Sequence, residues 1–376
     1  MSSKVSPESL EFHFSCLTDP RVKRTQDHSF TDILMLSLCA LLSGAETFVE
    51  FERFGKSKIE FLSTFLKLPN GIPSHDTFGR VFAALDPRQF SECFANWTDG
   101  LRNTVSEEIV AIDGKTLRRS HDRANGREAI HMVSAWAREN GLVLGQIKVN
   151  DKSNEITAIP ELLQRLNIAG CIVTIDAMGC QTKIAAEIAK GGGAYVLALK
   201  GNQSSLQDEV ESYFEDMLAV DLVGAKFESK QTAEKGHGRV ETRKYWITDE
   251  VEWLSNCKQW TNLRSIGMVE STRELQGQVT TERRFYICSI EANVETFARA
   301  VRGHWAIENS LHWSLDVSFN EDQCRVRMGH AAENFAILRH MALNLLKSDS
   351  TKKVGLKIKQ KCAGWDHSYL LSLLAI

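Results

Sequence analysis

The order of predicted strands and helices between residues 106 and 224 constrains the fold of this chain most strongly. Three short runs of apolar and β-branched residues come first. The last two flank Glu139-Asn140-Gly141, in which Asn-Gly is a strong hairpin-turn signal. Helical patterns then alternate with two buried-strand patterns, CIVTIDAMGC and AYVLALKGN. The order β-β-β-α-β-α-β-α predicts an α/β fold with helices on the faces of a mixed sheet.

Residues 1–105 predict helices. The stretch FTDILMLSLCALLSGAETFVEFERFG predicts one or two apolar-faced helices, with Thr31 as an N-cap. Ser74 predicts the start of a further helix, which Asp86-Pro87 separates from the next one. Two short helices joined by a tight turn are compatible with a helix-turn-helix that reads DNA and with a plain helical bundle. We favour the bundle, because turn chemistry alone does not identify a DNA-reading motif.

The remaining two segments differ from each other in pattern. Residues 225–290 are rich in strand patterns with turns such as Gly236-His237-Gly238, and we interpret them as an insertion within the α/β domain. Residues 291–376 return to helices and end in a lysine-rich tail. Such a tail is most often a solvated face, and near an active site it can also contact phosphates. Its lysines are Lys352, Lys353, Lys357, Lys359 and Lys361.

The stretch RGHWAIENSLHWSLDVSFNEDQCRVR, residues 302–327, predicts a helix that carries a carboxylate between two imidazoles. Helical spacing places Glu308 on one face with the two histidines, beside an apolar stripe. The histidines are His304 and His312, and the stripe consists of Ile307, Leu311 and Leu315. Both histidines are compatible with satisfied core residues and with a separate soft-metal site.

Two aspartates upstream of Glu308 suit a shared metal site. Asp113 comes near the end of the first predicted strand, and Asp176 follows the buried strand CIVTI. Adjacent strands lie about 4.8 Å apart, so carboxylates at neighbouring strand ends can share divalent cations. With Glu308 they predict an all-oxygen site for Mg²⁺ or Mn²⁺, where two ions support phosphoryl transfer on a phosphodiester. Taken singly, each acid is also compatible with a turn residue, a helix cap or a salt bridge.

Composition narrows the class of protein further. The 376 residues carry a formal net charge of −3, so any nucleic-acid surface must be local. Nine cysteines occur without a CxxC pair, which predicts reduced thiols and argues against a zinc ribbon. The sequence shows no signal-peptide pattern, and its best apolar run is about half of the roughly 20 residues that a membrane helix needs. These observations predict a soluble, cytoplasmic protein without a membrane partner.

Several spaced segments occur in an order that is similar to one known family. They are IVAIDGKTLRRS, EITAIPELLQRL, VTIDAMGCQ, LALKGNQ, HGRVETR and the stretch 302–327. From about residue 28 nearly to its end, the chain resembles the H-repeat-associated (Rhs-linked) transposases, bacterial insertion-sequence proteins of the DDE class. The resemblance implies an RNase H-like catalytic core with a β-rich insertion ahead of the final Glu. It also implies that Asp113, Asp176 and Glu308 are the catalytic and metal-holding residues.

The resemblance and the patterns together predict four segments. They are an N-terminal helical domain (1–105) that is a candidate for DNA binding, the first part of the core (106–224), the β-rich insertion (225–290), and the core's C-terminal helices with the basic tail (291–376). Related proteins with such an insertion carry Tyr, Arg and Lys around the last Glu. This chain has Val301, His304 and Leu315 there, and His304 is the candidate to replace the arginine.

The implied function is Mg²⁺- or Mn²⁺-dependent transposition of an insertion sequence. The protein would bind terminal inverted repeats, cleave them and join the 3′ ends to target DNA, acting as a homodimer on the DNA. Candidate DNA contacts are Lys115, Arg118, Arg119, Lys200, Asn202, Gln203, His237, Arg239, Arg302 and His304. Two alternatives remain open: an inactive remnant that only binds DNA, and a nuclease that cuts without joining.

Overall fold

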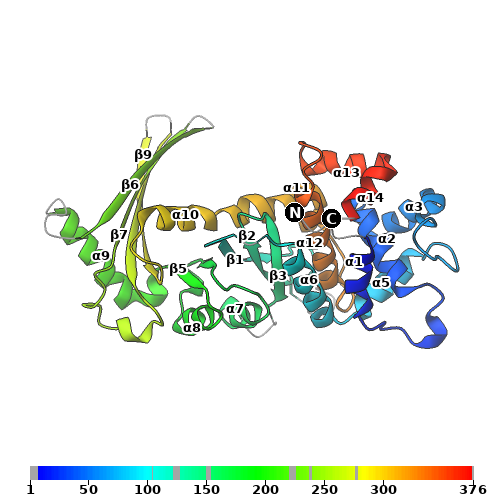
Figure 1. Cartoon of the computed structure of the whole chain (residues 1–376), viewed down its shortest axis with the longest axis horizontal. Helices are drawn as coiled ribbons and strands as arrows, with labels where there is room; N and C mark the ends of the chain where they lie inside the picture. The colour runs from blue at the N-terminus through cyan, green and yellow to red at the C-terminus, as the bar shows by residue number, and fades with distance from the viewer. Residues whose placement is uncertain are drawn as a thin grey trace.

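The computed structural model shows an elongated molecule organised around one nine-stranded sheet (Figure 1). The strand order is β3-β2-β1-β4-β5-β9-β8-β7-β6. Helices from both ends of the chain gather beyond β3, whereas long antiparallel strands form the opposite end of the molecule (Figure 1). The structure describes residues 7–103, 105–121, 128–149, 154–219, 226–236, 239–275 and 278–374.

The first five strands of the chain form the centre of the fold. They are β1 (Ile109–Thr116), β2 (His131–Ala137), β3 (Leu142–Lys148), β4 (Ile172–Ile175) and β5 (Ala194–Ala198). β1, β2 and β3 are antiparallel to one another, whereas β4 and β5 run parallel to β1. This is the RNase H-like arrangement, and it confirms the predicted α/β fold. Gly141 closes the β2–β3 hairpin at φ 67°, a conformation that glycine adopts readily.

Alternation along β1 divides its side chains between two layers of helices. Val110 and Ile112 belong to the core on one face, whereas Ile109 belongs to the core on the other. The first layer contains α7 (Glu155–Gln164) and α8 (Thr182–Lys190), and the second contains α10 (Val294–His304). The central strands are therefore covered on both faces, as their continuous apolar patterns predict.

The β-rich segment continues the core sheet instead of forming a separate one. Its strands are β6 (Glu228–Gly236), β7 (Arg239–Thr248), β8 (Ser265–Leu275) and β9 (Gln278–Cys288), and α9 (Ser204–Ala219) precedes them. Each strand pairs antiparallel with the next, and β9 pairs antiparallel with β5. The chain then enters α10, which runs along the face of the sheet opposite α7 and α8 toward the helical end (Figure 1).

Helices from the two ends of the chain share one core. They are α1 (Pro7–Ser15), α2 (Phe30–Leu42), α3 (Phe48–Ser57), α4 (Ile59–Leu62), α5 (His75–Ala84), α6 (Pro87–Leu101), α12 (Ala331–Ser348), α13 (Leu356–Trp365) and α14 (His367–Leu374). α12 lies at the centre, and its Phe335 contacts the rings of Phe48, Phe51 and Phe82. α5 and α6 both pack against α12, which is the packing expected of a helical bundle.

Two of the predicted helix boundaries are confirmed and one is wrong. The Ser74 side chain accepts a hydrogen bond from the Thr77 amide at the start of α5, and Asp86 caps α6 immediately before Pro87. α2 is capped by Ser29 instead of Thr31, because the Ser29 side chain accepts from the amide three residues further on.

Two further expectations concern the whole chain. All nine cysteines are free thiols, in agreement with the predicted absence of a disulfide framework. Within the part of the chain that the structure describes, we find no helix with the length and apolar character needed to cross a bilayer.

Candidate active site

Asp113 and Asp176 leave two neighbouring strands at the same level. β1 and β4 are parallel and pair Ile112 with Ile175, so the next residue of each strand is an aspartate. Asp113 was predicted near a strand end, but it lies inside β1, which continues beside β2 to Thr116. β4 stops at Ile175, and the Asp176 carboxylate caps the following 3₁₀ turn η3 (Ala177–Gly179). The core therefore places the two carboxylates side by side.

Glu308 lies on a π-helical turn, not on a regular α-helix. α10 ends at His304, the turn η6 spans Ile307–His312, and the Trp313 amide donates to the Glu308 carbonyl five residues earlier. Single π turns are rare in helices and are frequent at functional sites. Glu308 itself is exposed on this turn.

The helix after Glu308 is shorter than the sequence predicts. α11 (Trp313–Phe319) ends where Asn320 adopts a left-handed conformation at φ 50°, so the prediction of helix up to residue 327 is wrong. Asparagine tolerates this conformation and commonly terminates helices. The predicted apolar stripe is confirmed, because Ile307, Leu311 and Leu315 are buried.

The carboxylates influence one another electrostatically. Burial is the largest cause that raises the pKa of Asp113 to about 7, and the charges of Asp176, Glu155 and Glu308 raise it further, against a hydrogen bond from the Gly114 amide. Burial and Glu155 also raise the pKa of Asp176, opposed by backbone hydrogen bonds and by Lys200. Like charges in a partly desolvated site disfavour each other's ionised forms.

The two histidines that flank Glu308 are neutral. Burial lowers the pKa of His304 and of His312 to about 4. His304 Nδ1 lies 3.3 Å from Thr174 Oγ1, and His312 Nδ1 lies 3.6 Å from Asp113 Oδ2. This is the environment of core histidines, and a neutral His304 supplies no positive charge to a phosphate.

The donor chemistry of the site fits a hard divalent cation. Carboxylate oxygens are the ligands that Mg²⁺ and Mn²⁺ prefer, and a cation relieves the repulsion that raises the pKa of Asp113. Among the residues that the structure describes, no three His, Cys, Asp or Glu side chains are close enough to hold an ion in this arrangement.

Lys115 was predicted to contact DNA, but its ammonium is enclosed by carboxylates. Its Nζ lies 2.6 Å from Asp316 Oδ1, 2.8 Å from Glu321 Oε2 and 3.5 Å from Asp322 Oδ1, and its side chain is 12% exposed. Lys115 therefore joins β1 to the segment that follows Glu308. It positions that segment, and its ammonium is not free for a phosphate.

The Lys200–Gln203 segment supports the turn that follows Asp176. Asn202 Nδ2 donates to the Ala177 carbonyl at 2.9 Å, and Gln203 Nε2 donates to the Cys180 carbonyl at 3.0 Å. Both amide groups, predicted to face phosphate, are occupied in fixing this turn. Lys200 remains the cation that faces Asp176.

Two of the other predicted DNA contacts are ion-paired within the chain. The Arg302 guanidinium pairs with Glu234 at 2.8 Å, and Arg118 Nε lies 3.1 Å from Asp322 Oδ2, although Arg118 and Arg119 are both exposed. His237 falls outside the described residues, as does the side chain of Arg239.

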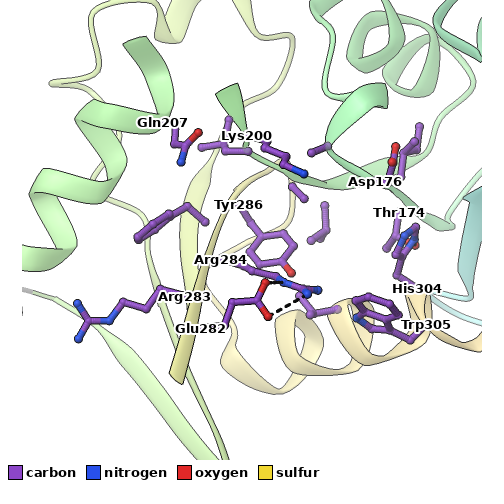
Figure 2. A pocket seen from close by; sticks show the side chains of 17 residues that line it. Thr174, Asp176, Lys200, Gln207, Glu282, Arg283, Arg284, Tyr286, His304 and Trp305 are labelled. Atoms are coloured by element: carbon purple, nitrogen blue, oxygen red, sulfur yellow. Dashed lines mark hydrogen bonds and ion pairs between the residues drawn. The ribbon is translucent and has the colours of Figure 1, made fainter. Parts of the chain in front are cut away.

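A cavity of about 410 Å³ adjoins Asp176, and the sequence did not reveal it. Figure 2 shows Asp176 and Lys200 near one side of it and Arg284 and Trp305 near the other. The Arg284 guanidinium lies 4.9 Å from the Trp305 ring centroid and is ion-paired with Glu282. Trp305 comes from the end of α10 and the other two from β9, so tertiary packing alone brings them together.

Comparison with known families identifies the class of protein. The family model described as "Transposase DDE domain" matches residues 105–345, and the one described as "DDE_Tnp_1-associated" matches residues 12–98. The first match covers the RNase H-like core and the β-rich segment, and it includes Asp113, Asp176 and Glu308.

Similar proteins narrow the identification. The chain is 43% identical to "H repeat-associated putative transposase YhhI" of Escherichia coli K12, over 96% of this chain and 97% of that protein. It is 40% identical to "Putative transposase YncI" of Escherichia coli O157:H7, over 99% and 95%. A solved structure of a piggyBac transposase synaptic complex with hairpin DNA aligns over 99% of this chain and 82% of that one, with a TM-score of 0.47 and 9% identity. The chain belongs to the H repeat-associated family of DDE transposases.

Proposed function

We propose that this transposase cuts the ends of an insertion sequence and joins them to target DNA, using Asp113, Asp176 and Glu308 as its catalytic acids. The observation that carries the proposal is the alignment of the two aspartates, which follow the paired residues Ile112 and Ile175 of parallel strands. The charge of Glu308, from a turn packed on β1, acts on Asp113.

The three carboxylates would hold two Mg²⁺ or Mn²⁺ ions. Bound there, such ions would activate a water or a 3′-hydroxyl and stabilise the leaving oxygen of a phosphodiester. Lys115 keeps the segment after Glu308 against β1, and Asn202 and Gln203 hold the turn after Asp176. The chain's own contribution is therefore mainly position and charge.

Positive charge for DNA comes from several places around the carboxylates. Lys200 faces Asp176 and the adjoining cavity, and the exposed Arg118 and Arg119 lie beyond the end of β1. Arg302, which is ion-paired with Glu234, is a further candidate, and His237 and Arg239 stay candidates from the sequence alone. Because two DNA ends are processed together, the working form is a homodimer on DNA.

The test uses purified protein and a supercoiled plasmid carrying the inverted repeats that flank the gene. With Mg²⁺ or Mn²⁺, the wild type should nick at the repeat boundaries, and Asp176→Asn and Glu308→Ala should bind the repeats without nicking. A joined product separates transposition from simple nuclease activity. Binding without cutting by the wild type under both metals would reject the proposal and indicate an inactive remnant.

A further inference from the structure

A fourth carboxylate lies against Gly114, the residue after Asp113, and comes from a different element. Glu155 is the first residue of α7, the helix that follows β3. α7 packs against β2, β3 and the turn η3, which directly follows Asp176. The Glu155 side chain is 20% exposed, so it is largely enclosed without being cut off from solvent.

The carboxylate of Glu155 lies in the space that a side chain at Gly114 would occupy. A Cβ atom at Gly114 would lie 2.2 Å from Glu155 Oε1 and 2.4 Å from His131 Nε2, closer than real Cβ contacts. Glycine inside a strand weakens it and often marks a site where another group approaches closely. Here the approaching group is the carboxylate of Glu155.

A hydrogen-bonded chain fixes one oxygen of Glu155. Glu155 Oε1 lies 2.5 Å from His131 Nε2, and His131 Nδ1 lies 2.9 Å from Thr116 Oγ1. Within the described part of the chain, the second oxygen, Oε2, has no hydrogen-bond partner. His131 thus anchors one oxygen of the carboxylate.

The charge of Glu155 acts on both aspartates. It raises the pKa of Asp113 more strongly than Glu308 does, after burial and the effect of Asp176, and among charged groups it is the largest influence on Asp176. A carboxylate that only fastened α7 to the sheet would gain nothing from this repulsion, since a glutamine could make the same hydrogen bond without it.

We propose that Glu155 is a further catalytic residue, whose Oε2 accepts a hydrogen bond from the attacking water or 3′-hydroxyl and thereby orients it. His131 holds the carboxylate, and Gly114 makes room for it. This role rests on the proposed function of the chain as a DNA-cleaving transposase. A misplacement of reacting groups by about 1 Å can cost about 100-fold in rate.

The experiment compares four full-length variants with the wild type in single-turnover nicking of a repeat-carrying plasmid. Glu155→Gln should be about 100-fold slower while it keeps the shape of the side chain. Glu161→Gln is the matched control, because Glu161 lies on the same helix and pairs with Arg165. Asp176→Asn reports on the proposed function, and His131→Gln reports on the support of the carboxylate.

Two further measurements separate catalysis from folding. Circular dichroism and affinity for the repeats should be the same for Glu155→Gln, Glu161→Gln and the wild type. Stabilisation of each protein against heat by Mn²⁺ gives a readout of the carboxylate centre that does not depend on turnover, and it should be weaker in Glu155→Gln than in Glu161→Gln.

The possible results distinguish this inference from the proposed function. Wild-type nicking that is lost in Asp176→Asn but within threefold of normal in Glu155→Gln would overturn the role of Glu155 alone. Absence of wild-type nicking would overturn both. If Glu155→Gln does not fold, a folded His131→Gln protein with about 10-fold slower nicking and unchanged DNA affinity would support the role, and one with full activity would overturn it.

Discussion

Replacing Asp113 by asparagine is expected to stabilise the metal-free protein while it abolishes DNA cleavage. Burial and the neighbouring charges of Asp176, Glu155 and Glu308 raise the pKa of Asp113 to about 7, from an ordinary value of 3.8. The ionised carboxylate therefore opposes folding near neutral pH. Asparagine has nearly the same shape and carries no charge, so it removes this cost.

The size of the effect follows from the pKa values. At about 1.36 kcal/mol per pKa unit, the difference between 3.8 and about 7 corresponds to about 4 kcal/mol. The side chain is 29% exposed, so solvent screens part of the repulsion. We expect Asp113→Asn to raise the free energy of unfolding by about 2–4 kcal/mol at pH 8, a large share of the stability of a typical domain.

The raised pKa of Asp113 determines how the stability advantage of Asp113→Asn changes with pH. A carboxyl group whose folded pKa is raised contributes most stability below its unfolded pKa, and that contribution is lost as pH rises toward the folded pKa. The advantage of Asp113→Asn should be small near pH 4, grow between pH 4 and pH 7, and stay constant above pH 7.

The assay is urea unfolding followed by circular dichroism, at several pH values and in the presence of EDTA. Asp208→Asn is the control, because Asp208 is an exposed residue of α9. Replacing EDTA with Mn²⁺ should stabilise the wild type more than Asp113→Asn. The difference in free energy of unfolding between the two proteins should therefore become smaller. An Asp113→Asn protein that is no more stable than the wild type at pH 8 in EDTA would refute the reasoning.

Three other substitutions test other parts of the structure. Lys115→Met should lower the free energy of unfolding in urea by about 3–5 kcal/mol, since it leaves the buried Glu321 without its nearest cation. Adding Glu321→Gln should restore part of this free energy. Gly267→Ala should cost about 1–3 kcal/mol in the same assay, because its Cβ would lie 2.5 Å from the Phe297 ring of α10. Lys200→Gln should weaken binding to DNA ends and lower the salt dependence of the affinity by about one counterion, measured by fluorescence anisotropy.

Each of these expectations has a result that contradicts it. Full stability of Lys115→Met would mean that the ion pairs around Glu321 contribute nothing. An unchanged Gly267→Ala would mean that the Phe297 ring does not lie against Gly267. An unchanged salt dependence in Lys200→Gln would place the DNA backbone away from Asp176.

The β2–β3 hairpin and the start of α5 could both be predicted, because the relevant signals are local. Asn140-Gly141 specifies a turn from its own backbone preferences, and Ser74 caps a helix that begins at the next residue. The buried runs before Asp113 and Asp176 predict strands from their composition. The three-carboxylate site itself stays a prediction: the fold aligns Asp113 with Asp176, but among the described residues no three such side chains lie close enough to hold an ion.

The sequence alone therefore determined the α/β strand order, the family and the candidate acids. Only the tertiary structure decided which charged side chains form ion pairs or lie close to one another. Lys115 and Glu321 are 206 residues apart in the chain, and only the packing of α11 and η7 (Glu321–Gln323) against β1 turns a predicted DNA contact into an internal ion pair. In the same way, the position of Glu155 at the start of a helix did not indicate a role in the site. Only the fold places its carboxylate against Gly114, the residue after Asp113. Electrostatic interactions depend on distances in space, and a one-dimensional pattern does not contain those distances.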